Sequence, residues 1–187
     1  MKFSKLDSKP LTTSDNTKIY DFKNAEKIFS DLKIKEFSRG DLILIILAAR
    51  EQPIHGRILL MKEMFLLYQK LLKPKTEDPK FVPYRFGPYS FHLTELIHIL
   101  NIEGLLEIKG RRNSNSESFK LTTKGRKEGK KVLKKLDKSE QKQIIENRKG
   151  WDQLGTAGIL NYVYKRYPDY KVKSFSKNRY KDVIWGQ

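Results

Sequence analysis

The sequence predicts a mainly α-helical protein with a small β-hairpin: a winged helix-turn-helix with an N-terminal arm and a C-terminal helical extension. Three features of residues 84–135 carry this prediction. Apolar residues spaced like one face of a helix come first: Leu93, Leu96, Ile97 and Leu100. Two alternating runs follow, joined by a loop of Gly, Asn and Ser, which is typical of a hairpin. A helix with a basic outer face comes next, and the tip of the hairpin is also basic.

The composition favours an anionic partner. The chain has 187 residues, of which 33% are charged, with a formal net charge of +17. Such a balance points most often to nucleic acid and less often to a membrane surface. The alternative is a chain kept soluble by lysine, because net charge alone discriminates weakly.

The sequence excludes or disfavours several classes of protein and of functional site. The chain contains no cysteine, so disulfides, thiolate chemistry and zinc sites with sulfur ligands are excluded. The first residues lack the apolar run of a signal peptide. The longest apolar run, 42–49, is far shorter than the ~20 residues that a membrane span needs. We therefore expect a cytoplasmic protein that does not enter a membrane.

The predicted arm occupies residues 1–37. Residues 1–24 are polar, and we expect an irregular terminus. Residues 25–32 can form a short helix with an apolar contact face of Ile28, Phe29 and Leu32.

The predicted winged-helix domain, 38–136, begins with two helices. Ser-Arg-Gly-Asp at 38–41 resembles a capping box ahead of the apolar run 42–49. Periodicity alone permits a buried strand there, but the cap and two alanines favour a buried helix that ends by Pro53. A second helix is predicted from 57 to 72, before Pro74.

An aromatic segment, Tyr-Arg-Phe-Gly-Pro-Tyr-Ser at 84–90, precedes the third helix. Gly-Pro indicates a turn. The aromatic rings could stack on the bases of a single strand, but packing of the loop against the core is the interpretation we favour.

The helix predicted at 91–103 occupies the position of a recognition helix, yet it carries no Lys or Arg. Phosphate and guanine contacts usually come from those residues. His92, Thr94 and Asn101 could contact base edges, whereas Glu95 and Glu103 would be repelled by phosphate.

The wing is better suited to an anion. It is predicted to pair residues 105–109 with 119–122. Residues 109–149 contain 15 Lys and Arg against five Asp and Glu. A lysine-rich helix is often only a solvated face, but concentration on one hairpin and the adjoining helix favours function. The candidate DNA-binding residues are Lys109, Arg111, Arg112, Asn113, Asn115, Lys120, Lys124, Arg126, Lys127, His92, Thr94 and Asn101.

The predicted extension, 137–187, begins with a polar helix at 137–150 that has Ile144 and Ile145 as its apolar contact. A further amphipathic helix ends at Pro168, with an apolar face of Leu160, Val163, Tyr164 and Tyr167. We expect these helices to pack on the winged helix or on a second copy, which would make a homodimer.

Three segments resemble a known group. Gly-Arg-Ile-Leu-Leu-Met-Lys-Glu-Met-Phe-Leu-Leu at 56–67 resembles a helix of YwgA-like uncharacterised proteins. The turn Tyr-Arg-Phe-Gly-Pro-Tyr-Ser at 84–90 is similar to theirs, as is Tyr-Val-Tyr-Lys-Arg-Tyr-Pro at 162–168 with Ser174 beyond it. Met61 departs from the glutamine expected before the helix lysine.

The resemblance covers residues 38–174 and implies a winged helix that is distantly similar to Panacea-type antitoxin domains. It also implies a prokaryotic origin, archaeal or viral. It implies no particular function, because that group is largely uncharacterised.

No motif of catalysis is present. The sequence lacks the phosphate-binding glycine loops and the H-E-x-x-H, G-x-S-x-G and EF-hand patterns. Its three histidines are His55, His92 and His98, and its carboxylates are scattered, whereas a nuclease needs them clustered for its metals. We therefore expect no enzyme, catalytic residue, metal or cofactor, although distant residues can still meet in space.

Two functions remain. The first is a DNA-binding winged-helix protein that regulates transcription, with double-stranded DNA held by phosphate neutralisation at the wing and the following helix. The alternative is a protein–protein interaction module of antitoxin or defence type, in which the acidic and apolar recognition helix meets another protein and the lysines are only surface.

Overall fold

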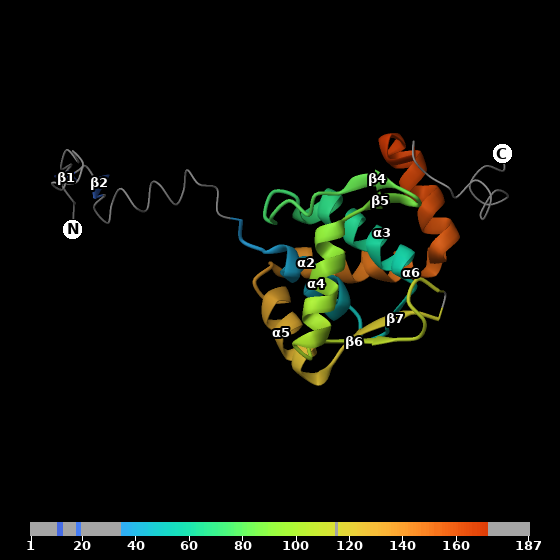
Figure 1. Ribbon diagram of the computed structural model, residues 1–187, viewed down its shortest axis with the longest axis horizontal. Coiled ribbons are helices and arrows are strands. Elements are labelled where there is room, and N and C mark those ends of the chain that lie inside the picture. Colours follow the sequence, from blue (N-terminus) through green and yellow to red (C-terminus); the bar gives the residue numbers. More distant parts are fainter. Residues whose placement is uncertain (1–10, 13–17, 20–34, 115, 172–187) are drawn as a thin grey trace. The chain divides into compact units, whose positions relative to one another are not determined.

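The computed structural model describes residues 11–12, 18–19, 35–114 and 116–171, which belong to two units, Met1–Lys35 and Glu36–Gln187 (Figure 1). In the first unit, β1 (Leu11–Thr12) pairs antiparallel with β2 (Lys18–Ile19). These two short strands replace part of the predicted irregular arm. The helix predicted at 25–32 lies outside the described residues.

The second unit is mainly helical, as predicted. Its elements in order are α2 (Arg39–Ala48), β3 (Ile54–His55), α3 (Arg57–Leu67), the π-helix η1 (Tyr68–Leu72), β4 (Val82–Tyr84), β5 (Gly87–Tyr89), α4 (Phe91–Ile102), β6 (Leu106–Lys109), β7 (Ser118–Leu121), α5 (Thr123–Leu133), α6 (Lys138–Arg166) and the short 3₁₀ helix η2 (Pro168–Lys171). Among the described residues, no helix is both long and apolar enough to span a bilayer.

The predicted hairpin exists, but it belongs to a sheet of three strands in the order β3-β7-β6. Ile54 lies opposite Phe119, which in turn lies opposite Ile108. The strand at 54–55 was not predicted, because two residues show no alternation of their own. The segment 84–90 was treated as a loop, yet β4 and β5 form a second hairpin in which Tyr84 pairs with Gly87.

The first helix confirms the preference for helix over strand. Ser38 caps α2 in a capping box: the Asp41 N–H donates to Ser38 Oγ at 3.1 Å, and the Ser38 N–H donates to Asp41 Oδ2 at 2.9 Å. All six residues from 42 to 47 are buried. A helix buried on every side needs covering elements all round, and α3, α4, α5 and β7 supply them.

Small residues bring α5 close to its neighbours. Thr122 caps this helix by accepting from the Gly125 N–H at 3.0 Å. A Cβ atom on Gly125 would lie 1.8 Å from the Leu105 carbonyl oxygen, and one on Gly129 would lie 2.8 Å from Ala48 Cβ. Both positions therefore require glycine, and α5 packs directly on α2 and the base of the hairpin.

The C-terminal extension differs from its prediction in two ways. The two predicted helices form one element, α6, kinked at Gly155, whose φ of 60° and ψ of −173° are not helical. Ile144 is buried as predicted, but Ile145 is 42% exposed. The inward face instead turns from Ile144 to Arg148 and Trp151, at the helical spacing of about 3.6 residues.

A buried group of charges joins three segments. Glu63 lies on α3, Arg148 and Asp152 lie on α6, and Arg50 follows α2. Arg148 Nε lies 2.8 Å from Glu63 Oε2, and Arg148 also pairs with Asp152, which pairs with Arg50. Arg148 and Glu63 have no exposed side-chain surface. Burial raises the pKa of Glu63 to about 8, against the attraction of Arg148 and with the help of neighbouring Asp152.

We predict that Arg148→Met will destabilise the protein by about 3–5 kcal/mol, because it leaves the buried Glu63 without its cation, whereas Asp152 keeps Arg50. Urea denaturation followed by circular dichroism measures the change. The double variant Glu63→Gln, Arg148→Met should recover part of the loss, since it removes the carboxyl group that has lost its partner. A variant as stable as the wild type would contradict the structural role of this cluster.

The raised pKa of Glu63 also predicts a pH dependence. Its folded-state pKa of about 8 lies above the ordinary value of 4.5, so the folded protein binds a proton that the unfolded chain releases between these values. The contribution of Glu63 to stability is thus complete below pH 4.5 and is lost as the pH rises toward 8. Glu63→Gln should flatten this decline, measured from about pH 5 to 7. Equal slopes in the two proteins would show that Glu63 ionises normally.

Candidate nucleic-acid interface

The β6–β7 hairpin, which we call the wing after its predicted role, presents one charged face and one buried face. Glu107 lies opposite Lys120, and Lys109 lies opposite Ser118. Directly opposite residues share a face of a sheet, so Lys109 and Lys120 both point outward. Lys109 Nζ lies 3.2 Å from Glu107 Oε1, which partly neutralises this face. Ile108 and Phe119 point inward to the core.

The wing tip is anchored at its base while its cations stay exposed. Glu117 is buried and accepts from the Asn113 N–H at 2.9 Å and from Arg57 Nη2 at 2.5 Å. Gly110 and Asn113 both have positive φ, 83° and 60°, which the tight turn requires. Arg111, Arg112 and Asn113 are exposed as predicted, and Asn115 lies outside the described residues.

Some of the remaining cations converge beside the hairpin base. Lys120, Arg126 and Lys130 line a small depression together with Arg50 and Glu51. Residues from β7 and α5 therefore share one surface. Lys130, which was not among the predicted DNA-binding residues, lies on it too. Lys127 is exposed on the same helix.

Two of the predicted cations already donate to the protein. Lys124 Nζ donates to the Glu103 carbonyl oxygen at 3.0 Å, and Arg126 donates to the Leu121 carbonyl oxygen at 3.3 Å. Each retains further N–H donors, so both can still contact a phosphate.

The candidate base-contacting residues of α4 are less available than predicted. Thr94 is half-buried, and its hydroxyl group donates to the Ser90 carbonyl oxygen at 3.0 Å or to the Tyr89 hydroxyl at 2.8 Å. Asn101 Nδ2 donates to the Leu106 carbonyl oxygen at 2.7 Å. His92 alone of the three is exposed without a bond of this kind in the described part of the chain.

The exposed face of α4 is apolar and acidic. Phe91, Ile99 and Ile102 are 53%, 45% and 85% exposed. With Glu95 they fall within about 80° around the helix, at 100° per residue. Such a surface suits a partner other than phosphate.

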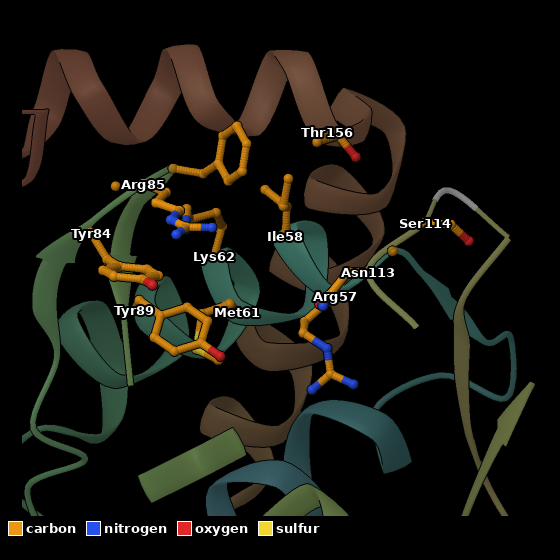
Figure 2. A pocket seen from close by; sticks show the side chains of 13 residues that line it. Arg57, Ile58, Met61, Lys62, Tyr84, Arg85, Tyr89, Asn113, Ser114 and Thr156 are labelled. Carbon is orange, nitrogen blue, oxygen red and sulfur yellow. The ribbon is translucent and has the colours of Figure 1, made fainter. Parts of the chain in front are cut away.

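Sequence reasoning missed a pocket at the start of α3 (Figure 2). Its cavity volume is about 300 Å³. The first turns of α3, the β4–β5 hairpin, the wing tip and α6 surround it, through Gly56, Arg57, Ile58, Met61, Lys62, Tyr84, Arg85, Phe86, Gly87, Tyr89, Asn113, Ser114 and Thr156. The signal in the sequence was the pair of cations in the otherwise apolar start of this helix.

Phe86 and Tyr89 of the aromatic segment pack against the core, which confirms the interpretation that we favoured. The aromatic side chains beside the pocket also contact one another. The Tyr84 ring lies 5.2 Å from Tyr89 and 5.4 Å from Phe91, centre to centre. The described residues contain no group of three His, Asp or Glu side chains that could hold a metal ion.

No family model matches the chain, and a search of curated proteins found no match. The resemblance to YwgA-like proteins, given above on three segments, is therefore a proposal.

We predict that Glu117→Gln will loosen the wing tip, because it weakens the buried contacts to Arg57 and Asn113. Hydrogen exchange at residues 110–114 should become faster. Glu107→Gln is the matched control, since its ion pair with Lys109 is exposed and worth ~0–1 kcal/mol. Equal exchange in both variants would mean that the tip is held in another way.

Proposed function

We propose that the protein is a winged-helix DNA-binding regulator of transcription, as its sequence led us to expect. The order of α2, β3, α3, α4, β6 and β7, with β7 central in the sheet, supports a winged helix. Exposed cations on the wing and α5 are the observation that carries the proposal. Phosphate contacts of this kind supply most non-specific affinity for DNA.

In this proposal the wing and α5 hold the backbone, and α4 does not enter the major groove as a main reader. Arg111 and Arg112 can contact phosphate or guanine, since guanidinium groups bind both in bidentate fashion. Glu95 and the apolar residues of α4 offer nothing to a phosphate, while Thr94 and Asn101 are engaged within the protein.

The test compares two double variants that each remove two exposed cations: Arg111→Ala, Arg112→Ala on the wing, and Lys142→Ala, Lys149→Ala on α6, outside the proposed surface. Fluorescence anisotropy with duplex DNA, titrated against salt, measures binding. The wing variant should lose about 1–3 kcal/mol if it contacts guanine, or reduce the salt slope by about 1 per lost phosphate contact.

The control variant should change DNA binding much less than the wing variant. Equal losses in the two would show that only net charge matters. No binding of the wild type at low salt would reject DNA as the partner.

The exposed face of α4 supports a second candidate, a protein–protein interaction module of antitoxin or defence type. Phe91, Ile99 and Ile102 form an apolar stripe beside Glu95. Its complement is a partner protein with an apolar groove and a basic rim.

A photo-crosslinking residue at position 102 tests this candidate, with position 134 as the control. The same partner should be crosslinked from 102 and from 99, and Phe91→Ser should abolish both products. If position 134 gives the same products, the stripe is not an interface.

A further inference from the structure

The lining of the pocket beside α3 includes three cationic side chains and no carboxylate. Arg57, Lys62 and Arg85 line it, and none of its 13 lining residues is acidic. A concave site lined by charges of one sign focuses the potential and concentrates ions of the opposite sign. The pocket is therefore suited to an anion.

Lys62 is the most deeply placed of these cations. Its side chain is 1% exposed, and Nζ donates to the Pro88 carbonyl oxygen at 2.8 Å. An ammonium group has three N–H donors, so this bond uses one of them. Burial lowers the pKa of Lys62 to about 7, which means that the charged form is held there at a cost. A bound anion would remove that cost.

Arg57 has a donor without a partner. Its side chain is 7% exposed, and Nε and Nη2 donate to Glu117 at 3.3 and 2.5 Å. Nη1 is buried and has no hydrogen-bond partner among the described residues. The guanidinium also lies over the Phe119 ring, with its central carbon 5.2 Å from the ring centre. Arg57 is therefore engaged with the wing, and the cations left for a ligand are Lys62 and Arg85.

The wall opposite Arg57 is aromatic. Figure 2 shows Tyr84, Tyr89 and Met61 gathered on one side of the pocket, with Arg57 and Asn113 on the other. The two tyrosine rings lie 5.2 Å apart, and the Arg85 guanidinium lies 5.6 Å from the Tyr84 ring. Aromatic faces beside guanidinium groups accept flat rings by stacking.

We propose that this pocket binds a mononucleotide, with its phosphate at Lys62 and Arg85 and its base against Tyr84 and Tyr89. The volume of about 300 Å³ lies at the lower limit of small-molecule sites. It thus matches one nucleotide more closely than a dinucleotide. Asn113 and Ser114 of the wing tip and Thr156 of α6 supply amide and hydroxyl groups for the sugar and base edges. This site does not depend on the DNA-binding proposal.

Isothermal titration calorimetry on the full chain tests the proposal with AMP, GMP, CMP and UMP, and with adenosine and inorganic phosphate as fragments. At least one nucleotide should bind with a Kd below about 1 mM. The fragments should bind at least tenfold more weakly, since each engages half of the site. Failure of all four nucleotides, or phosphate binding as tightly as they do, would overturn the proposal.

Arg85→Met and Arg112→Met form a matched pair, because both remove one exposed arginine charge but only Arg85 lines the pocket. Arg85→Met should weaken nucleotide binding at least tenfold, and Arg112→Met should leave it within twofold. Lys62→Met should also weaken binding at least tenfold, and circular dichroism checks that this variant is folded. Equal weakening by Arg85→Met and Arg112→Met would assign the affinity to overall charge and overturn the site.

Discussion

The fold depends on a guanidinium group that has no contact with water. Arg148 joins Glu63 of α3 to Asp152 of α6, and Arg50 extends the group to the end of α2. Burying such charges is expensive, and their mutual attraction offsets the cost only when the geometry is good. The helices must therefore sit at one relative position, which a purely apolar contact between them would not enforce. We regard this specificity as the main effect of the cluster.

That constraint reaches the pocket through α3. Lys62 and Glu63 are neighbours in the sequence, so their side chains leave the helix about 100° apart. Glu63 meets α6, whereas Lys62 turns toward β5 and the pocket. Arg57, five residues before Lys62, pairs with Glu117 at the foot of the wing. One short helix thus contacts the extension, the β4–β5 hairpin and the wing through three charged side chains, Glu63, Lys62 and Arg57.

Local features of the fold were predictable, and long-range ones were not. Caps at Ser38, Ser90 and Thr122 are encoded within a few residues, and the structure contains all three. Strand β3 exists because Ile54 pairs with Phe119, and no local pattern shows this. Pro83 and Pro88 argued against strands at 82–89, because proline cannot donate a backbone hydrogen bond. In the structure they lie opposite each other in the β4–β5 hairpin.

In the candidate site, too, local features were predictable from the sequence and long-range contacts were not. Exposure of Arg111 and Arg112 followed from their place in a polar turn. The internal bonds of Thr94 and Asn101 depend on how α4 meets its neighbours, so helix periodicity could not reveal them. The buried cluster and the pocket each contain residues from segments that are distant in the sequence. Their proximity becomes visible only in the three-dimensional structure.

The complete burial of residues 42–47 has a consequence for synthesis. Leu-Ile-Leu-Ile-Ile-Leu is an uncharged, β-prone hexapeptide, the kind of segment that aggregates when exposed. Two of the elements that bury this hexapeptide, β7 and α5, are synthesised more than 70 residues later. At about 5–20 residues per second, the hexapeptide stays without them for several seconds during translation. Asp41 and Arg50, which flank the hexapeptide closely, are placed to act as gatekeepers during that interval.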